Sequence, residues 1–276
     1  MAGTRTSTEQ TVLQKFYRDY LNGSHILHYH NVLDAFGHLS FRHPLNPNIF
    51  IMSRNAAPAT ISSPNDLIEY YVEDSKPVDP NAAAGFLERH IHSECYKRYP
   101  GVRSVIHSHS EAVVPYTFSG VPLRACYHMA GFLGLEVPVW DIEDAQRPGD
   151  ISDLLVRNVH LGSSLANSFA GSKQDGNDLP QHTVVLMRGH GFTVLAGNME
   201  ECVMRAVYTQ KNAMIQTTAL MTRAADLQTD KASKAIKYLS QKEVDDTTWS
   251  IPQSAHRPWK LWLREVEACN LYVNSA

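Results

Sequence analysis

The chain has 276 residues, a hydrophobic share of 43% and a formal net charge of −3. This composition is that of a folded globular protein with a sizeable core. The balanced charge, without a basic run, argues against nucleic-acid binding. No apolar run reaches the roughly 18 residues of a membrane helix. Residues 1–10 are polar, so a signal peptide is not expected either.

The cysteines bear on the location of the protein, and the histidines bear on metal binding. The four cysteines lack any CxxC pair, which favours neither a zinc ribbon nor a disulfide framework. We therefore expect reduced thiols and a cytoplasmic location. The 14 histidines are the unusual feature of the composition, since histidine is the commonest metal ligand.

The spacing of apolar residues predicts alternating helices and strands. Gly23 either splits the first helix or allows close packing there. In chain order, the expected elements are a helix over 8–34, a strand from Gly37 to Pro44, a strand over 48–53, a short helix near 65–70, a strand near 71–73, a helix over 85–98, a strand over 102–106, a helix over 111–119, a strand over 137–141, a helix over 150–170, a loop over 171–180, strands over 183–187 and 192–195, and a helix over 198–219.

The alternation contains no GxGxxG or P-loop sequence, no internal repeat and no interdomain linker. It predicts one α/β domain of several layers over residues 1–276. The core spans about 10–220, and an irregular helical extension spans about 221–276. The extension carries an aromatic group, which we expect to cover a hydrophobic surface or interface rather than shape a pocket: Trp249, Trp259, Trp262 and Tyr272.

His107 and His109 flank Ser108 at the end of a predicted buried strand. Side chains two residues apart on a strand point to the same face, so the two imidazoles project together. His190 follows a second strand-like run and lies between Gly189 and Gly191. Three imidazoles on two strand ends predict a metal site with positions left open for water or substrate. The alternative is three core histidines satisfied by hydrogen bonds.

Glu88 lies 19 residues before His107, in the helix that leads into this strand. A helix–turn–strand unit reverses the chain, so the early helix residues lie near the strand's end. Glu88 is therefore a candidate fourth ligand or a general base beside the metal. The alternative is a surface carboxylate on a charged helix.

These residues resemble the class II aldolase/adducin family. The resemblance rests on Glu88-Arg89-His90-Ile91-His92, Tyr99-Pro100, Val105-Ile106-His107-Ser108-His109 and Arg188-Gly189-His190-Gly191. It implies that His107, His109 and His190 bind one divalent metal ion per subunit (Zn, Mn, Fe, Co or Ni), with Glu88 as acid/base. It also implies a three-layer α/β/α sandwich around a mainly antiparallel sheet, and a homotetramer.

Two departures bear on the substrate. The sugar-phosphate aldolases of this family carry two serines directly before the glutamate, where this chain has Phe86-Leu87. Their small T-G-N stretch is replaced by Ala35-Phe36-Gly37-His38. Both changes disfavour a phosphorylated sugar.

The stretches around Phe36, His38, Ser53, Arg54, Arg124, Tyr127 and His128 are more similar to the hydroxypyridine-dicarboxylate decarboxylase branch of the family. This resemblance implies a flat aromatic acid as the substrate. Phe36 offers a ring face, and Arg54 or Arg124 offers bidentate carboxylate binding. His38 and His128 can hydrogen-bond a ring hydroxyl or deliver a proton. Ser53 and Tyr127 complete the candidate substrate-binding residues, whereas Glu88 and His128 are the candidate catalytic ones. The alternatives are purely structural roles: a surface salt bridge for Arg54 and, for His128, a buried histidine whose ring nitrogens are hydrogen-bonded.

The sequence therefore predicts a metal-dependent carbon–carbon lyase that acts on a small molecule and on neither nucleic acid nor membrane. The favoured reaction is non-oxidative decarboxylation of a non-phosphorylated hydroxy-aromatic or heteroaromatic acid, through an enolate-like charge that the metal stabilises. The first alternative is an aldolase acting on a non-phosphorylated carbonyl compound. The second is a non-catalytic, adducin-like interaction protein.

Overall fold

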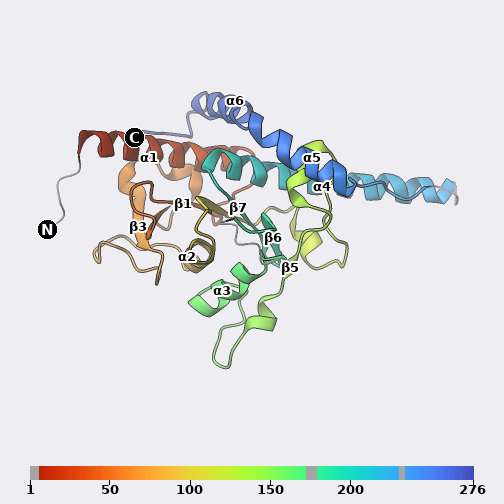
Figure 1. The fold of residues 1–276 in the computed structure, drawn as a ribbon, viewed down its shortest axis with the longest axis horizontal. Coiled ribbons are helices and arrows are strands. Elements are labelled where there is room, and N and C mark those ends of the chain that lie inside the picture. The colour runs from red at the N-terminus through yellow and green to blue at the C-terminus, as the bar shows by residue number, and fades with distance from the viewer. Residues whose placement is uncertain (1–5, 172–178, 230–233) are drawn as a thin grey trace.

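A seven-stranded sheet forms the centre of the described part of the molecule (Figure 1). The computed structural model describes residues 6–171, 179–229 and 234–276. The strand order is β3-β2-β1-β4-β7-β6-β5, and every neighbouring pair is antiparallel except β5 with β6. The strands are β1 (His38–Arg42), β2 (Ile49–Ser53), β3 (Leu67–Tyr71), β4 (Ser104–Ser108), β5 (Val139–Trp140), β6 (Val184–Met187) and β7 (Gly191–Ala196).

Helices cover both faces of this sheet (Figure 1). One face carries α1 (Ser7–Tyr29), α4 (Met199–Thr229), α5 (Gln241–Ser250) and α6 (His256–Glu267). The other carries α2 (Arg89–Arg98) and α3 (Val159–Asn167). A separate hydrophobic core lies between the sheet and each helical layer. The expected three-layer α/β/α sandwich with a mainly antiparallel sheet is therefore confirmed.

Alternation along the strands decides which side chains face which layer. On β4, Ile106 belongs to the core under α1 and α4, whereas Val105 belongs to the core under α2. On β1, Leu39 and Phe41 belong to the first of these cores. Strand side chains alternate between faces. His38, Ser40 and Arg42, which alternate with these two residues, therefore face α2, and so does His107.

Helix α1 begins with a capping box between Thr6 and Glu9 and continues unbroken to Tyr29. Gly23 does not split it. A Cβ atom at Gly23 would lie 3.2 Å from Leu39 Cδ2 and 3.4 Å from Met199 Sδ. The glycine therefore serves close packing against the sheet and α4.

Three expected elements are wrong, each for a local reason. The helix expected over 111–119 is a 3-10 segment over Val114–Thr117, since Pro115 would lie inside that helix and cannot donate a hydrogen bond to the carbonyl four residues earlier. The helix expected over 150–170 is confined to Val159–Asn167, because Leu154 has a φ of 66° and Asn158 caps the helix that follows.

The third error concerns residues 65–70, expected as a short helix. They lie mostly in β3, an edge strand paired with β2. Ile68 and Tyr70 are buried there while their neighbours are more exposed, which is the two-residue period of a strand. The helix expected over 85–98 also starts later, at Arg89. Of the loop expected over 171–180, residues 172–178 lie outside the described part of the chain.

The C-terminal extension is helical, as predicted, and packs into the main core. Trp259, Trp262 and Val266 of α6 belong to the core beneath α1 and α4. Trp249 differs, since it is 75% exposed. The end of α4 projects beyond the body of the molecule in Figure 1. The domain limits themselves stay a prediction.

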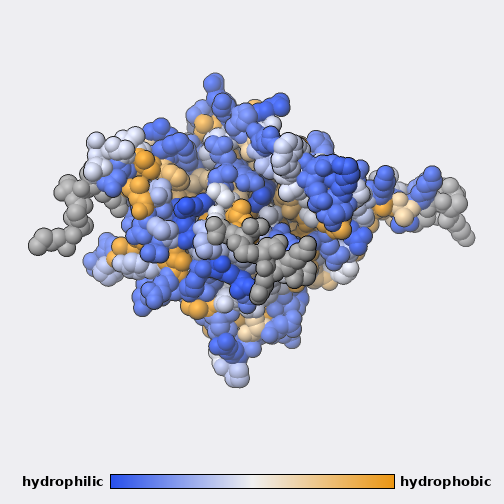
Figure 2. Space-filling model, in the orientation of Figure 1, coloured by the Kyte–Doolittle hydropathy of each residue, from blue (hydrophilic) through white to orange (hydrophobic). Residues whose placement is uncertain are grey.

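The surface is mainly hydrophilic on the face that Figure 2 shows, with hydrophobic side chains in small scattered groups. None of the helices in the described ranges combines the length and apolar character needed to cross a membrane.

Candidate metal and active site

Three histidine side chains converge where β4 ends and the β6–β7 turn begins. The Nε2 atoms of His107 and His109 are 2.9 Å apart, and those of His107 and His190 are 3.3 Å apart. The Nε2 atoms of His190 and His109 are 3.1 Å apart. The three residues that the sequence singled out thus present the same ring atom to one point.

Strand alternation brings the first pair together as predicted. His107 is fully buried on the α2 face of β4, while the Ser108 hydroxyl donates to the Val32 carbonyl on the opposite face. His190 stands in the tight turn between β6 and β7, where its backbone N–H donates to the Met187 carbonyl at 3.0 Å. Pairing of β7 with β4 then sets this turn beside the end of β4.

Gly191 serves the close approach of two strands rather than that of a ligand. A Cβ atom there would lie 2.0 Å from the Ser108 carbonyl oxygen and 3.1 Å from the Cα of His109. Both neighbours belong to the backbone of the segment that carries the histidine pair, so neither can swing aside as a side chain can.

We expect Gly191→Ala to lower the free energy of unfolding by at least about 2 kcal/mol, because the added methyl group forces β7 away from β4. Urea denaturation measures this change. Gly197→Ala is the matched control, since its Cβ would meet nothing closer than 3.9 Å. We expect that control to stay within about 0.5 kcal/mol of wild type. Equal stability of the two variants would contradict the steric argument.

Glu88 is the fourth member of the cluster. It stands at the N-cap of α2, one residue before the helix, and not within the helix as expected. Its Oε1 accepts the Val156 N–H at 3.0 Å. Its Oε2 lies 3.7 Å from His107 Nε2 and 3.6 Å from His190 Nε2. Burial raises the pKa of this carboxyl to about 7.

The donor set fits a divalent metal ion. One ligand atom from each of Glu88, His107, His109 and His190 lies within 4.8 Å of the others. A tetrahedral site with metal–nitrogen distances of about 2.0–2.1 Å keeps its nitrogens roughly 3.4 Å apart, close to the spacing of the three imidazoles. Burial holds the pKa of His107 well below its usual value and lowers that of His190 to about 4, which favours the neutral form that binds metals.

Asp34 contacts the far side of the His109 ring and had no role in the sequence interpretation. Its Oδ2 lies 3.5 Å from His109 Nδ1. Its Oδ1 accepts the N–H groups of Phe36 and Gly37, both at 2.8 Å. A carboxylate at the outer nitrogen of a ligating histidine orients the ring and fixes its tautomer. Asp34 is thus a candidate positioning residue that sequence reasoning missed.

A cavity of about 520 Å³ opens beside His109. Its wall includes Asp34 and Glu111 as acidic groups, and Val32, Leu33, Ala112 and Met214 as apolar ones. No arginine or lysine is among the described residues that line it. Phe36 lies on the loop next to Asp34 and is 70% exposed.

Of three further predicted residues, His38 lies beside the cluster, whereas Ser53 and Arg54 make their contacts elsewhere. His38 is buried, with its Nε2 atom 3.9 Å from Glu88 Oε2 and its ring centroid 5.1 Å from that of His107. Ser53 ends β2 and is buried, with its N–H donating to the Tyr20 hydroxyl. Arg54 follows it, and its Nε donates to Asp66 at 2.8 Å. The salt bridge expected as the structural alternative for Arg54 is therefore present, with Asp66 as its partner.

The structure does not bring the remaining three predicted residues into contact with this cluster. Arg124 lies 3.7 Å from Glu136 and over the ring of Tyr238. The ring of Tyr127 contacts those of His128 and Tyr208. His128 is exposed at the start of a 3-10 helix. The roles assigned to these residues stay predictions.

Known proteins match this chain in sequence and in fold. The sequence matches the family described as Class II Aldolase and Adducin N-terminal domain over residues 21–217. The chain belongs to this family. It is 48% identical over 259 residues to the protein named decarboxylase tropJ of Talaromyces stipitatus, covering 94% of this chain and 97% of that protein. It is 26% identical over 154 residues to a 3,4-dihydroxyphthalate decarboxylase of Arthrobacter keyseri, covering 56% of this chain and 52% of that enzyme.

Solved structures agree on the fold. An aldolase II superfamily protein from Pseudomonas syringae superposes with a TM-score of 0.70 at 15% identity, covering 94% of each chain. An L-fuculose 1-phosphate aldolase from Glaciozyma antarctica superposes with a TM-score of 0.67 at 15% identity, covering 96% of this chain and 93% of that one. At such identities the likeness shows the class II aldolase fold and nothing finer.

Family membership and the 48% identical decarboxylase together establish that the protein is an enzyme of the lyase class. The predicted resemblance to the class II aldolase/adducin family, with decarboxylases among its relatives, is confirmed. The prediction of an enzyme rather than a non-catalytic interaction protein is confirmed as well.

Burial also predicts how stability varies with pH. His92 of α2 is fully buried and burial lowers its pKa to about 3, whereas the unfolded chain has the ordinary value of 6.5. Its contribution is fully present above pH 6.5 and is lost as the pH falls from 6.5 toward 3, because only the unfolded state takes up the proton. At pH 5.5 this one group costs on the order of 1 kcal/mol of unfolding free energy relative to pH 7.5.

We therefore expect His92→Gln, which cannot take up that proton, to lose on the order of 1 kcal/mol less unfolding free energy than wild type between pH 7.5 and 5.5. Urea denaturation of metal-free protein at both pH values measures the difference. Parallel pH dependence of the two proteins would show that His92 does not titrate differently on folding.

Proposed function

We propose that this enzyme decarboxylates a non-phosphorylated hydroxy-aromatic or heteroaromatic acid and uses one divalent metal ion per subunit. The observation that carries the proposal is the meeting of the three histidine Nε2 atoms beside the Glu88 carboxyl. The 48% identity to a protein named as a decarboxylase supports the choice of reaction.

His107, His109 and His190 would hold the metal ion, with Glu88 as an additional ligand or a neighbour. A bound divalent metal would supply Lewis-acid stabilisation of the negative charge that develops when carbon dioxide leaves. Zinc, manganese, iron, cobalt and nickel all suit imidazole ligands.

Glu88 is proposed to supply the proton. In the reaction, the carbon–carboxylate bond breaks, its electron pair stays on the ring carbon, and carbon dioxide departs. A proton from Glu88 Oε2 then forms the new C–H bond, and solvent restores it. The Val156 N–H holds Oε1, which leaves Oε2 turned toward the histidines. A general acid in such a position contributes about 10²- to 10⁴-fold to a rate.

The residues beside Glu88 favour a substrate without a phosphate. Phe86 is buried and its ring centroid lies 4.7 Å from that of His38, and Leu87 is 54% exposed. Neither offers a hydroxyl to a phosphate dianion. The cavity beside His109 has a volume typical of small-molecule sites. We propose it as the place of the aromatic ring, with the exposed Phe36 on the loop that follows Asp34.

The decisive experiment supplies hydroxy-aromatic acids, 3,4-dihydroxyphthalate among them, to metal-loaded protein and measures released carbon dioxide. Non-phosphorylated sugar-like ketols are tested in parallel with aldehyde trapping. Carbon dioxide with a matching loss of the aromatic acid supports the proposal. Aldehyde from the ketols, without carbon dioxide from the acids, would establish the aldolase alternative in its place.

We further propose a cytoplasmic homo-oligomer, a tetramer by family resemblance. Apolar side chains on the outer part of α4 support the oligomer because they are exposed in the single chain: Met214, Ile215 and Met221. A neighbouring subunit would bring further residues to the site, such as an arginine for the substrate carboxylate. Light scattering that gives a monomer mass at micromolar concentration would contradict this proposal.

A further inference from the structure

A buried row of polar side chains runs from Glu88 into the layer between the sheet and α2. His38 and Ser40 stand two residues apart on β1, and His92 and Tyr96 stand one turn apart on α2. The Tyr96 hydroxyl lies 2.7 Å from Ser40 Oγ, and Ser40 Oγ lies 2.6 Å from His92 Nδ1. His92 Nε2 lies 2.7 Å from His38 Nδ1.

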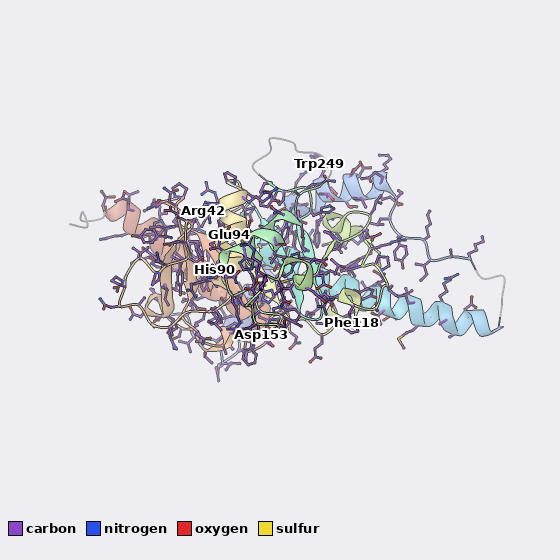
Figure 3. The ribbon with its side chains drawn as sticks, turned by 90° about the horizontal axis from the view of Figure 1, so that it is seen from below. Arg42, His90, Glu94, Phe118, Asp153 and Trp249 are labelled. Carbon is purple, nitrogen blue, oxygen red and sulfur yellow. The ribbon has the colours of Figure 1, made fainter. Side chains whose placement is uncertain are left out.

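All four side chains are almost completely shielded from solvent. Arg42, the next residue of β1 on the same face, lies over the Tyr96 ring and donates to the Tyr96 carbonyl, which closes the row at its inner end. In Figure 3 the labelled Arg42 lies beside α2, the helix that carries the labelled His90 and Glu94. At the other end, the buried His38 Nε2 has no hydrogen-bond partner in the described part of the chain and lies 3.9 Å from Glu88 Oε2.

The hydrogen atoms along this row can run in two orders, which differ in the end of the row that keeps a donor without a hydrogen-bond partner. Ser40 Oγ is the hydrogen-bond partner that the described residues offer to the Tyr96 hydroxyl, so Tyr96 donates to Ser40. Ser40 then donates to His92 Nδ1, and a neutral imidazole that accepts at Nδ1 carries its hydrogen on Nε2. His92 in turn donates to His38 Nδ1, which places the hydrogen of His38 on Nε2. The reverse order would leave the buried Tyr96 hydroxyl donor without an acceptor, which is costly. The first order instead leaves the donor on His38 Nε2, which faces the Glu88 carboxyl at 3.9 Å.

We propose that Tyr96, Ser40 and His92 hold His38 as the neutral tautomer with its hydrogen on Nε2, aimed at Glu88 Oε2. His38 then offers a fixed N–H group to the carboxylate that Glu88 becomes once it has given up its proton. His92 acts as a positioning residue through His38. This role rests on the proposed function of Glu88, whereas the tautomers themselves do not.

Nitrogen-15 NMR of protein labelled at histidine tests the tautomers directly, in the metal-free state at neutral pH. Signals are assigned by their loss in His38→Gln and His92→Gln. We expect both residues to carry hydrogen on Nε2 and a bare Nδ1. A hydrogen on Nδ1 of either residue overturns the inference, whether or not the protein decarboxylates any substrate.

Kinetics of the metal-loaded enzyme test the positioning role. We expect His92→Leu to lower kcat about 10- to 100-fold with unchanged KM and metal content, as loss of an outer-shell partner does. His92→Gln should recover most of the rate, since its amide N–H can replace the donor to His38 Nδ1. His90→Leu is the control on the same helix, because the His90 Nδ1 lies 3.2 Å from Ser75 Oγ, outside the row.

Equal rates for His92→Leu and wild type, or equal losses in His92→Leu and His92→Gln, would overturn the positioning role. So would an equal loss in His90→Leu. If His92→Leu fails to fold, the wild-type tautomers together with the rate of His92→Gln decide the inference.

Discussion

Replacement of His109 by alanine is expected to abolish metal binding and turnover together. The His109 Nε2 lies 2.9 Å from that of His107 and 3.1 Å from that of His190, so it occupies one corner of the three-nitrogen site. The variant leaves His107, His190 and Glu88, one ligand fewer than the four that this site presents. We expect less than a tenth of the wild-type metal content and a loss of kcat of at least about 10³-fold. Elemental analysis and a decarboxylation assay measure the two effects.

The matched control is His160→Ala. His160 is partly buried on α3, and its Nε2 pairs with Asp150 at 2.8 Å, away from the three nitrogens. We expect this variant to keep its metal and its rate. Full metal content in His109→Ala would show that His109 is not a ligand. A rate within about tenfold of wild type would show that the chemistry does not depend on the site.

Much of the fold could be predicted from local pattern. The strand over Ser104–Ser108 and the hairpin of β6 and β7 follow from short apolar runs bounded by glycine or proline, which is a strong local signal. The errors fall where a single residue overrides periodicity. Leu154 adopts a left-handed conformation that periodicity does not indicate, and Pro115 limits its segment to a 3-10 turn.

The candidate ligands could be found because their geometry is local or follows from family motifs. His107 and His109 lie on one strand, and a helix–turn–strand unit returns Glu88 to its end. Asp34 was missed because its contact with His109 joins two distant segments, although a carboxylate bonding to N–H groups two and three residues on is a known turn signal.

The buried row was missed for a related reason. His92 and Tyr96 are spaced by one helical turn, and His38 and Ser40 by one strand period, so each pair can be read from the sequence. Which helix face meets which strand is set by packing across the whole layer. A single sequence therefore shows the two pairs but not that they form one chain of hydrogen bonds.

Replacement of Glu88 by glutamine should separate metal binding from chemistry. The amide oxygen can still accept the Val156 N–H, so the side chain keeps its place at the start of α2. An amide cannot release a proton at neutral pH, so the step that forms the new C–H bond loses its donor. We expect kcat to fall about 10²- to 10⁴-fold while most of the metal remains. Turnover measured beside elemental analysis of the same sample tests both statements.

Glu94→Gln is the matched control for Glu88→Gln. Glu94 is a buried acidic residue on α2, six residues after Glu88, and it pairs with Lys97 at 2.6 Å. Glu94→Gln makes the same carboxyl-to-amide change, so a general effect of losing a buried carboxyl group would appear in both variants. A loss of rate confined to Glu88→Gln would locate the proton donor at the carboxyl that faces the histidines. A rate for Glu88→Gln within about tenfold of wild type would move that role to another residue, and the loss of its metal would make Glu88 chiefly a ligand.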